Sequence, residues 1–308
     1  MTKEEMRTLL TGSGAAAVGF AAAMPPDVGE IDRFSRWIAR GDHAGMTYME
    51  RHATLRQSLD NVLPGTRTVV SMAFSFVPPQ ERPQTLPAIA RYAYGRDYHK
   101  VIPGRLAEPL RRLRESYPQE SFRLCIDSAP VAERYWAVKA GIGFRGLNGS
   151  VIVDGCGCYC FLCELLTTLE IESDTSSGKH CLQCGECLRR CPTGALGSAG
   201  IDCRRCLSYL TIEHRGDWDA EGERAMATDA GRRTLFGCDI CLTACPHNRN
   251  LPPSPIEEFH PSPDMLSLDA TSLFGSDREL RQRLAGSPLL RARPEGLRRN
   301  AAWNRNGE

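Results

Sequence analysis

Two runs of closely spaced cysteines in the middle of the chain restrict its fold more than any other feature. They are Cys181-x-x-Cys184-x-x-Cys187-x-x-x-Cys191-Pro192 and Cys238-x-x-Cys241-x-x-x-Cys245-Pro246. The first run has the spacing of bacterial ferredoxins, in which three cysteines bind one 4Fe–4S cluster and the fourth binds a second cluster. Two-residue gaps wrap a tight loop around one cluster, and the proline after the last cysteine turns the chain away. The spacing therefore predicts two 4Fe–4S clusters that pass single electrons.

Two clusters need eight thiolates, and the two runs provide seven. The second run has Leu235 where a further cysteine would complete the pattern, so the eighth ligand is expected between the runs, at Cys203 or Cys206. The predicted ligands of the first cluster are Cys181, Cys184, Cys187 and Cys245. Those of the second cluster are Cys191, Cys238, Cys241 and one of the two candidates. Two structural zinc sites are the alternative, but the doubled spacing and the two Cys-Pro endings favour clusters.

Fourteen cysteines are the outlier in an otherwise ordinary composition, with 308 residues, a net charge of +1 and 24% charged residues. A chain of this length does not need disulfides, so grouped Cys-x-x-Cys motifs indicate metal. The apolar stretch 15–24 is similar to a signal peptide, but Glu4 and Glu5 precede it. No apolar run approaches the ~20 residues that span a bilayer. We expect a cytoplasmic protein without a membrane partner.

The chain is expected to form three parts. They are an α/β domain over residues 1–175, a ferredoxin-like domain over 176–255 and a short helical C-terminal extension over 256–308. In the first part, apolar patterning predicts strands at 17–21, 69–77, 122–126 and 151–153, and helices at the N-terminus, at 98–116 and at 130–139, the last capped by Ser128. In the extension, Ser276 with Glu279 forms a capping box, and Ser287 begins another helix.

Two motifs in the first part are similar to cofactor sites but have a better structural explanation. Gly141, Gly143 and Gly146 match the dinucleotide fingerprint G-x-G-x-x-G, but they follow a predicted helix and precede a strand, which is the reverse of the order required. We therefore expect a helix cap and a tight loop. Asp97 and His99 begin a motif similar to D-x-H-x-x-G of cobalamin proteins, but the next glycine is too distant. We assign His99 to the start of a helix.

Asp127 is a candidate ligand-binding residue because it follows a predicted strand, where ligands gather in open α/β folds. An N-cap of the next helix is the alternative, which the residues alone favour. Glu133 and Arg134 are expected on a solvated helix face or in an ion pair. A dense group of cysteines has apolar neighbours, which predicts buried free thiols and leaves a third metal site as the alternative. These are Cys156, Cys158, Cys160 and Cys163.

Segments over nearly the whole chain resemble the epoxyqueuosine reductase family, in the family's order. Together with the first cysteine run they are RYAYGRDYH (91–99), DSAPVAER (127–134), AGIGFRGLN (140–148), FLCELLTTLE (161–170), CLSYLTIE (206–213), FGCDICLTACP (236–246), SPLLR (287–291) and LRRN (297–300). The resemblance implies reduction of epoxyqueuosine to queuosine at the wobble position of tRNA. It also implies a cobalamin held between the N-terminal domain and the clusters, and a short form without the helical repeats of longer members.

The family's motifs carry several roles over to this chain. The resemblance implies that Cys206 is the eighth cluster ligand and that Asp127 is the proton donor and a cobalamin contact. Further cobalamin contacts implied in this way are Arg56, Ala90, Val151, Leu162 and Leu165. Epoxyqueuosine-containing tRNA and an electron donor are the expected partners of a monomer. From Asp277 onward eight arginines stand against four acids, which predicts either phosphate contacts or a solvated helix face.

Two other functions remain open from the residues. A different cobalamin and iron–sulfur reductase, such as one that removes halide, would use the same cofactors, although that class usually carries an export signal. A non-enzymatic electron carrier would use the clusters alone and would leave the first domain without a role.

Overall fold

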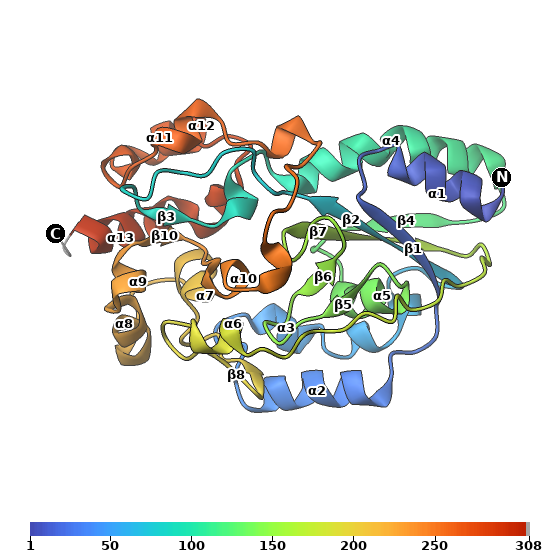
Figure 1. The fold of residues 1–308 in the computed structure, drawn as a ribbon, viewed down its shortest axis with the longest axis horizontal. Helices are drawn as coiled ribbons and strands as arrows, with labels where there is room; N and C mark the ends of the chain where they lie inside the picture. Colours follow the sequence, from blue (N-terminus) through green and yellow to red (C-terminus); the bar gives the residue numbers. More distant parts are fainter. Residues whose placement is uncertain (306–308) are drawn as a thin grey trace.

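The first half of the chain is built around a four-stranded antiparallel sheet (Figure 1). The computed structural model describes residues 1–305. The strands follow the order β1 (Ala17–Ala22), β2 (Thr68–Ser75), β7 (Cys160–Thr167) and β4 (Phe122–Cys125). Val70 lies opposite both Phe20 and Leu165 in the register. Every residue of β2 is buried, because this strand has a neighbour on each side and helices over both faces.

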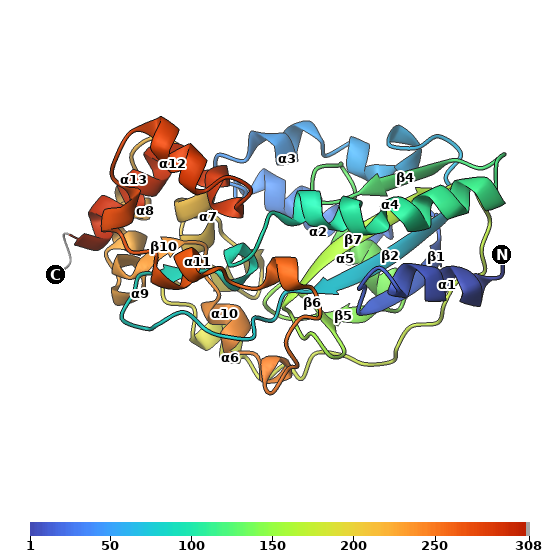
Figure 2. The same ribbon diagram turned by 90° about the horizontal axis from the view of Figure 1, so that it is seen from above.

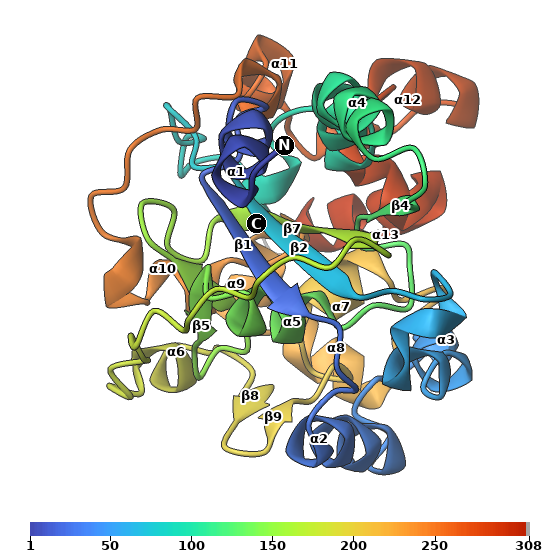
Figure 3. The ribbon, with the colours of Figure 1, turned by 90° about the vertical axis from the view of Figure 1, so that its right-hand side faces the viewer.

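Helices cover both faces of the sheet (Figure 3). The side chains of β7 alternate between the two faces. α1 (Lys3–Thr11) and α4 (Tyr98–Ser116) lie on one face, while α5 (Glu133–Lys139) and the hairpin of β5 (Gly143–Arg145) and β6 (Val151–Val153) lie on the other. Phe161, Cys163 and Leu165 belong to the core beneath α1 and α4. Leu162 and Leu166 pack on the side of α5.

The cysteine-rich half lies beside the sheet along the long axis of the molecule (Figure 2). Its helices are α6 (Glu186–Arg189), α7 (Leu207–Ile212), α8 (Ala220–Met226), α9 (Asp229–Arg232) and α10 (Ile240–Thr243), and β8 (Leu196–Gly197) pairs with β9 (Gly200–Ile201). β3 (Ala88–Ile89) pairs in parallel with β10 (Thr234–Phe236). A strand from the first half therefore joins the cysteine-rich half, which the predicted division into parts does not anticipate.

The C-terminal segment packs over this strand pair. Its helices are α11 (Pro263–Ser267), α12 (Asp277–Arg283) and α13 (Arg293–Arg305), and they share one core with Ile89 and Phe236. Asn300 donates to the carbonyls of Thr211 and Leu235, both at 2.9 Å. The 3-10 helices of the chain are η1 (Leu55–Gln57), η2 (Leu59–Asn61), η3 (Arg91–Ala93), η4 (Pro246–Asn248), η5 (Glu257–Phe259), η6 (Thr271–Leu273) and η7 (Pro288–Ala292). Residues 306–308 of the predicted extension lie outside the described residues.

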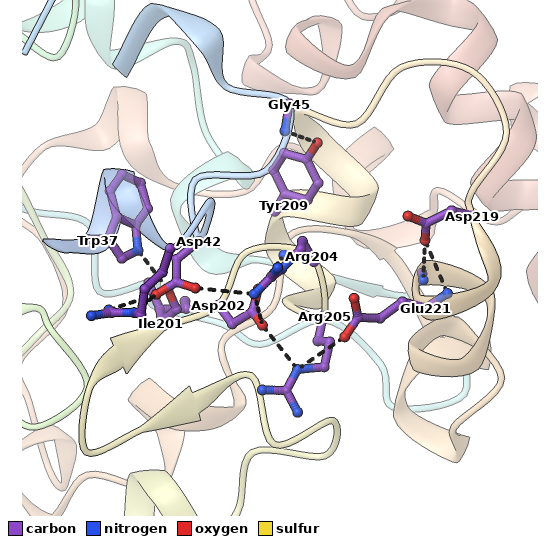
Figure 4. Close-up of polar contacts among 12 residues, drawn as sticks. Trp37, Asp42, Gly45, Ile201, Asp202, Arg204, Arg205, Tyr209, Asp219 and Glu221 are labelled. Atoms are coloured by element: carbon purple, nitrogen blue, oxygen red, sulfur yellow. Dashed lines mark hydrogen bonds and ion pairs between the residues drawn. The ribbon is translucent and has the colours of Figure 1, made fainter. Parts of the chain in front are cut away.

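The end of α2 (Val28–Ala39) and the loop between it and α3 (Thr47–Arg51) tie the first half to the cysteine-rich half (Figure 4). Three contacts make the connection: Trp37 Nε1 to the Ile201 carbonyl at 2.7 Å, Gly45 N to the Tyr209 hydroxyl at 2.8 Å, and Arg204 Nη2 to the Asp42 carboxylate at 3.2 Å. Polar contacts made by half-buried groups are stronger than those of fully exposed ones. They hold residues 201–209 in place, and this segment contains both candidates for the eighth cluster ligand.

Most predicted elements are confirmed because they rest on local apolar patterning. The helix at 98–116 and the strand at 151–153 have their predicted bounds, and β1, β2 and β4 lie within about two residues of theirs. The Ser276–Glu279 capping box is also present. Within residues 1–305, each helix is too short or too polar to reach across a bilayer.

The prediction for α5 is wrong at its start. The helix begins at Glu133, and Ala132 stands at its N-cap position, so Ser128 does not cap it. Residues 126–132 form tight turns instead, in which Ser128 N donates to the Ile126 carbonyl at 2.5 Å and Val131 N to that of Ala129 at 2.8 Å. The expected helix cap and loop after α5 are confirmed, because Gly141 has φ +74 and β5 follows it.

Gly19 offers a test of the packing between β1 and α5. A Cβ on Gly19 would lie 2.1 Å from the Ala140 carbonyl oxygen, which the backbone cannot avoid without shifting, whereas a Cβ on Gly104 in α4 meets nothing within 4 Å. We predict that Gly19→Ala costs about 1–3 kcal/mol and lowers the thermal unfolding midpoint. Gly104→Ala, the matched control, should leave the midpoint unchanged or raise it. Equal midpoints for both variants would contradict this packing.

Candidate functional site

The structure brings the four predicted ligands of the first cluster together around one hollow. Cys181, Cys184, Cys187 and Cys245 all line it, although about 60 residues separate the last from the others. α6, which contains Cys187, and α10, which contains Cys241, pack against each other and make this meeting possible. We call these residues quartet one. Four thiols facing one hollow are a donor set that suits a 4Fe–4S cluster.

A second group forms where the remaining cysteines meet. Burial raises the pKa of Cys238 to about 12, with smaller contributions from Cys206 and Cys191 nearby. Burial likewise raises the pKa of Cys241, to which Cys238, Cys206 and Cys191 contribute. We call Cys191, Cys206, Cys238 and Cys241 quartet two. Cys203 is buried in the core around Leu207, Tyr209 and Trp218, against which Cys206 and Cys238 also pack, and its backbone N donates to the Asp42 carbonyl at 2.8 Å.

The quartets are looser than the ligand set of a single ion. Among residues 1–305, no three His, Cys, Asp or Glu side chains are arranged to hold one metal ion. Of the four extra cysteines, Cys156, Cys158 and Cys163 are buried free thiols and Cys160 is half-buried. Cys158 packs against Cys245 of quartet one, and burial raises its pKa to about 12.

Asp127 lies in the loop after β4 and does not cap the next helix, so the N-cap interpretation is wrong. Its backbone is left-handed, with φ +54, a conformation that Asp tolerates better than most residues. The side chain is 62% exposed. The Tyr98 hydroxyl donates to Asp127 Oδ2 at 2.6 Å, and His99 Nε2 lies 3.8 Å from the same oxygen. The Tyr98 ring is fixed by stacking on Phe161, with 4.2 Å between the ring centres.

Glu133 anchors the Asp127 loop, a role that the sequence analysis missed. Its Oε1 accepts a hydrogen bond from Asp127 N at 2.5 Å. Burial raises the pKa of Glu133 to about 8, and the neighbouring Asp127 adds to the shift. Arg134 donates instead to the Gly149 carbonyl at 3.2 Å. The expected solvated face is confirmed for Arg134, which is exposed, but not for Glu133, because the helix starts at Glu133 and this side chain turns back toward the loop.

Glu164 is a second acid that the sequence analysis passed over. It lies in the middle of β7, opposite Ser71 and Cys125, and is completely buried. Burial raises its pKa well above the usual range, and Glu133 contributes to the shift. Ser71 Oγ lies 3.4 Å from Oε1. A charged residue type within an otherwise apolar strand was the available signal, since such residues are almost never fully buried without a reason.

Arg56 supports the Asp127 loop from the other side and has a free donor. Its Nη1 donates to the Val131 carbonyl at 2.9 Å. Its Nε is buried and has no hydrogen-bond partner among the residues that the structure describes. An unsatisfied buried donor is costly and calls for an explanation, and an amide-rich cofactor such as cobalamin would provide acceptors for it.

The other predicted cobalamin contacts are divided between the site and the core. Val151 and Leu162 pack together on the α5 side of the sheet, with Leu162 half-buried. Ala90 is buried beside the quartet two loop, where its N donates to the Phe236 carbonyl at 2.8 Å. Leu165 has no exposed surface and packs in the core beneath α4. Its side chain therefore supports the sheet and presents no surface to a ligand.

All three parts of the chain contribute to the surroundings of Asp127. Arg291 from η7 makes a bidentate ion pair with Glu213 at the end of α7, with N–O distances of 2.7 and 2.9 Å. Burial raises the pKa of Tyr48 in α3, and the charges of Glu213 and Asp127 add to the shift. Tyr48, Asp127, Glu213 and Arg291 therefore lie within electrostatic range of one another, so the site is composite.

Cluster content tests the choice between the two candidate ligands. We predict that Cys206→Ser removes one cluster, so that reconstituted protein holds about four irons per chain in place of about eight. Cys203→Ser is the matched control and should keep both clusters, because Cys206 is the candidate whose charge acts on both Cys238 and Cys241. Iron and sulfide analysis measures both variants. Loss of a cluster from Cys203→Ser, with Cys206→Ser unaffected, would reverse the assignment.

Hydrogen exchange tests the anchoring of the Asp127 loop. Glu133→Ala removes the acceptor for Asp127 N and should speed amide exchange over residues 127–132 by about tenfold, the worth of one hydrogen bond. Glu133→Gln keeps an acceptor oxygen and should exchange as the wild type does. Wild-type exchange in the alanine variant would show that the loop is held by other contacts.

Comparison with known proteins identifies two matching family models. Residues 56–128 match the family described as "Epoxyqueuosine reductase QueG, DUF1730". Residues 180–248 match the "4Fe-4S double cluster binding domain". The second match covers both cysteine runs and favours 4Fe–4S clusters over the zinc alternative.

Relatives named epoxyqueuosine reductase align with this chain over most of their length. The epoxyqueuosine reductase of Pseudomonas aeruginosa is 37% identical over 286 residues, which cover 90% of this chain and 78% of the relative. That of Gloeobacter violaceus is 36% identical over 97% of this chain and 94% of the relative.

The structure of epoxyqueuosine reductase from Streptococcus thermophilus is 27% identical, with a TM-score of 0.84 over 98% of this chain and 80% of that one. An epoxyqueuosine reductase solved with an epoxyqueuosine-modified tRNA-Tyr stem loop shares the fold, at 24% identity and a TM-score of 0.86, with the same coverage. The chain belongs to the epoxyqueuosine reductase family.

Proposed function

We propose that this chain reduces epoxyqueuosine to queuosine in tRNA, with two 4Fe–4S clusters and cobalamin as its cofactors. The match of the chain to epoxyqueuosine reductases over most of their length supports this function. The structural observation that links this function to individual residues is the position of Asp127. Its side chain is exposed at the end of β4 and is held there by Tyr98 and Glu133.

The reaction sets the requirements for the site. Converting the epoxide to an alkene releases its oxygen as water and consumes two electrons and two protons. Cobalamin, when bound, supplies the low-potential reducing chemistry. The protein must position the epoxide, exclude water and supply protons next to the leaving oxygen.

Asp127 is the residue proposed to supply a proton. Because Oδ2 accepts the Tyr98 hydroxyl, Oδ1 is the oxygen that can carry the proton toward substrate. Glu133 holds the backbone of the same residue. Two independent contacts therefore fix the carboxyl group, one on its side chain and one on its main chain, which is the preorganisation that proton transfer requires.

The remaining residues are proposed to hold the cofactors. Quartet one and quartet two would each bind one 4Fe–4S cluster, as the match to the double-cluster domain supports. Arg56, Ala90, Val151 and Leu162, together with Asp127, are proposed cobalamin contacts, and the free donor of Arg56 supports its place among them. Leu165 would support the sheet from within the core and would not contact the cofactor.

The partners and location follow from the proposed reaction. The substrate is tRNA carrying epoxyqueuosine in its anticodon, and a one-electron donor must supply the clusters. We propose a cytoplasmic monomer, which agrees with the location of the tRNA pool. An electron carrier without enzymatic activity is less well supported, because it gives no role to Asp127 and its anchors. A different cobalamin reductase remains the outcome to be tested.

A reconstituted assay tests the function and the role of Asp127 together. Protein with both clusters and cobalamin, given a chemical reductant and epoxyqueuosine-containing tRNA, should form queuosine that mass spectrometry detects. Asp127→Asn should lower the rate by about 10²-fold or more, the usual contribution of a general acid, while iron content and cobalamin absorbance stay unchanged. Asp32→Asn, at an exposed position in α2, is the matched control.

Other outcomes of this assay would contradict either the role of Asp127 or the proposed function. Wild-type turnover in Asp127→Asn would remove its role as proton donor. Cobalamin binding without queuosine formation in the wild type would favour another reductase, and absence of cobalamin binding would favour an electron carrier.

A further inference from the structure

Quartet one has the more exposed cysteine of the two groups. Cys184 is exposed, whereas Cys191, Cys206, Cys238 and Cys241 of quartet two are all half-buried. Quartet two also lies toward the reaction site, since Asp239 in its loop accepts from Arg91 N at 2.7 Å. The neighbouring Tyr92 packs edge-on against Tyr98, with 6.5 Å between the ring centres, and Tyr98 donates to Asp127. An electron from outside would therefore enter at quartet one and leave from quartet two.

Apolar side chains surround the exposed edge of quartet one. Leu182, between Cys181 and Cys184, is 62% exposed, and Leu147 is 36% exposed. Both line the hollow that the quartet one cysteines share. Most large apolar side chains on a folded protein are buried, and adjoining exposed ones mark contact surfaces. Two leucines give only a small apolar centre, which suits a brief encounter more than a permanent interface.

Charged side chains near this centre are in cationic excess. Arg189 Nη2 donates to the Cys184 carbonyl at 2.8 Å, and Arg190 is 72% exposed. Lys179, two residues before Cys181, is 57% exposed. Glu186 and Asp154 are the acids that pair with these cations. Three cations against two acids leave a positive rim, which attracts a partner with an acidic face.

We propose that the surface formed by Leu182, Leu147, Arg189 and Arg190 is the docking site for a small acidic one-electron carrier protein, of the ferredoxin or flavodoxin class. The inference rests on the proposed function in requiring that quartet one holds a cluster. Each encounter oxidises one reduced carrier and delivers one electron to the protein. Two encounters supply the two electrons that one turnover consumes.

Binding and reduction by a carrier test the proposal on the full chain with both clusters reconstituted. The probe is a plant-type 2Fe–2S ferredoxin, titrated in its oxidised form by calorimetry and used in its reduced form to bleach the clusters in a stopped-flow experiment. Arg190→Glu should weaken binding about tenfold at low salt and slow bleaching by a similar factor, and the difference should shrink as salt rises. Leu182→Ser should weaken binding at all salt concentrations.

Two controls distinguish a loss of carrier docking from disruption of the clusters or of the fold. Dithionite is a small reductant that needs no docking surface, so Arg190→Glu should be bleached by it at the wild-type rate and should form queuosine as the wild type does when it is supplied. Arg281→Glu reverses an exposed charge on α12, which lies away from α6 (Figure 1), and should bind ferredoxin as the wild type does.

Three results would overturn the proposal. Wild-type binding and bleaching by ferredoxin in both variants would place the docking site elsewhere. Slower bleaching of Arg190→Glu by dithionite would make this residue a support of the cluster. A wild-type dimer that Arg190→Glu dissociates would make a second copy of the chain the occupant of this surface. Failure of queuosine formation with dithionite, while ferredoxin binding is normal, would count against the proposed function and leave the docking site in place.

Discussion

The meeting of the two cysteine runs is the constraint on which the rest of the structure depends. Cys245 joins the loop of Cys181–Cys187, and Cys191 lies with the loop of Cys238–Cys241, so each run would complete the proposed ligand set of the other. α6 and α10 pack together to allow this exchange. Because neither set is complete until both runs have folded against each other, cluster binding and the tertiary structure of this half are coupled.

The same arrangement builds the site around Asp127. The quartet two loop reaches the first half through Arg91 N and Asp239, and β10 pairs with β3 immediately before that contact. The C-terminal segment then covers the strand pair and brings Arg291 to Glu213. Asp127, the proposed proton donor on the first half, therefore lies near residues that reach their places only when the cysteine-rich half has folded. This dependence explains why the three parts of the chain share strands and cores.

Local patterns predicted the elements and the cluster cysteines, whereas long-range contacts decided the rest. The helix at 98–116 and the buried strand near 69 follow from apolar spacing alone. Spacing could not choose between Cys203 and Cys206, because both are near enough in sequence. In the fold, the charge of Cys206 acts on Cys238 and Cys241, whereas Cys203 is buried in the core around Trp218. Glu133 could not be found from a helical pattern, because its role depends on the left-handed turn at Asp127 six residues earlier.

An iron-edge anomalous structure of the anaerobically reconstituted protein tests the central claim most directly. The account predicts two clusters, one bound by Cys181, Cys184, Cys187 and Cys245, and the other by Cys191, Cys206, Cys238 and Cys241. It also predicts that Cys203 stays in the core around Trp218. Clusters bound separately by each run, or Cys203 as a ligand in place of Cys206, would contradict it.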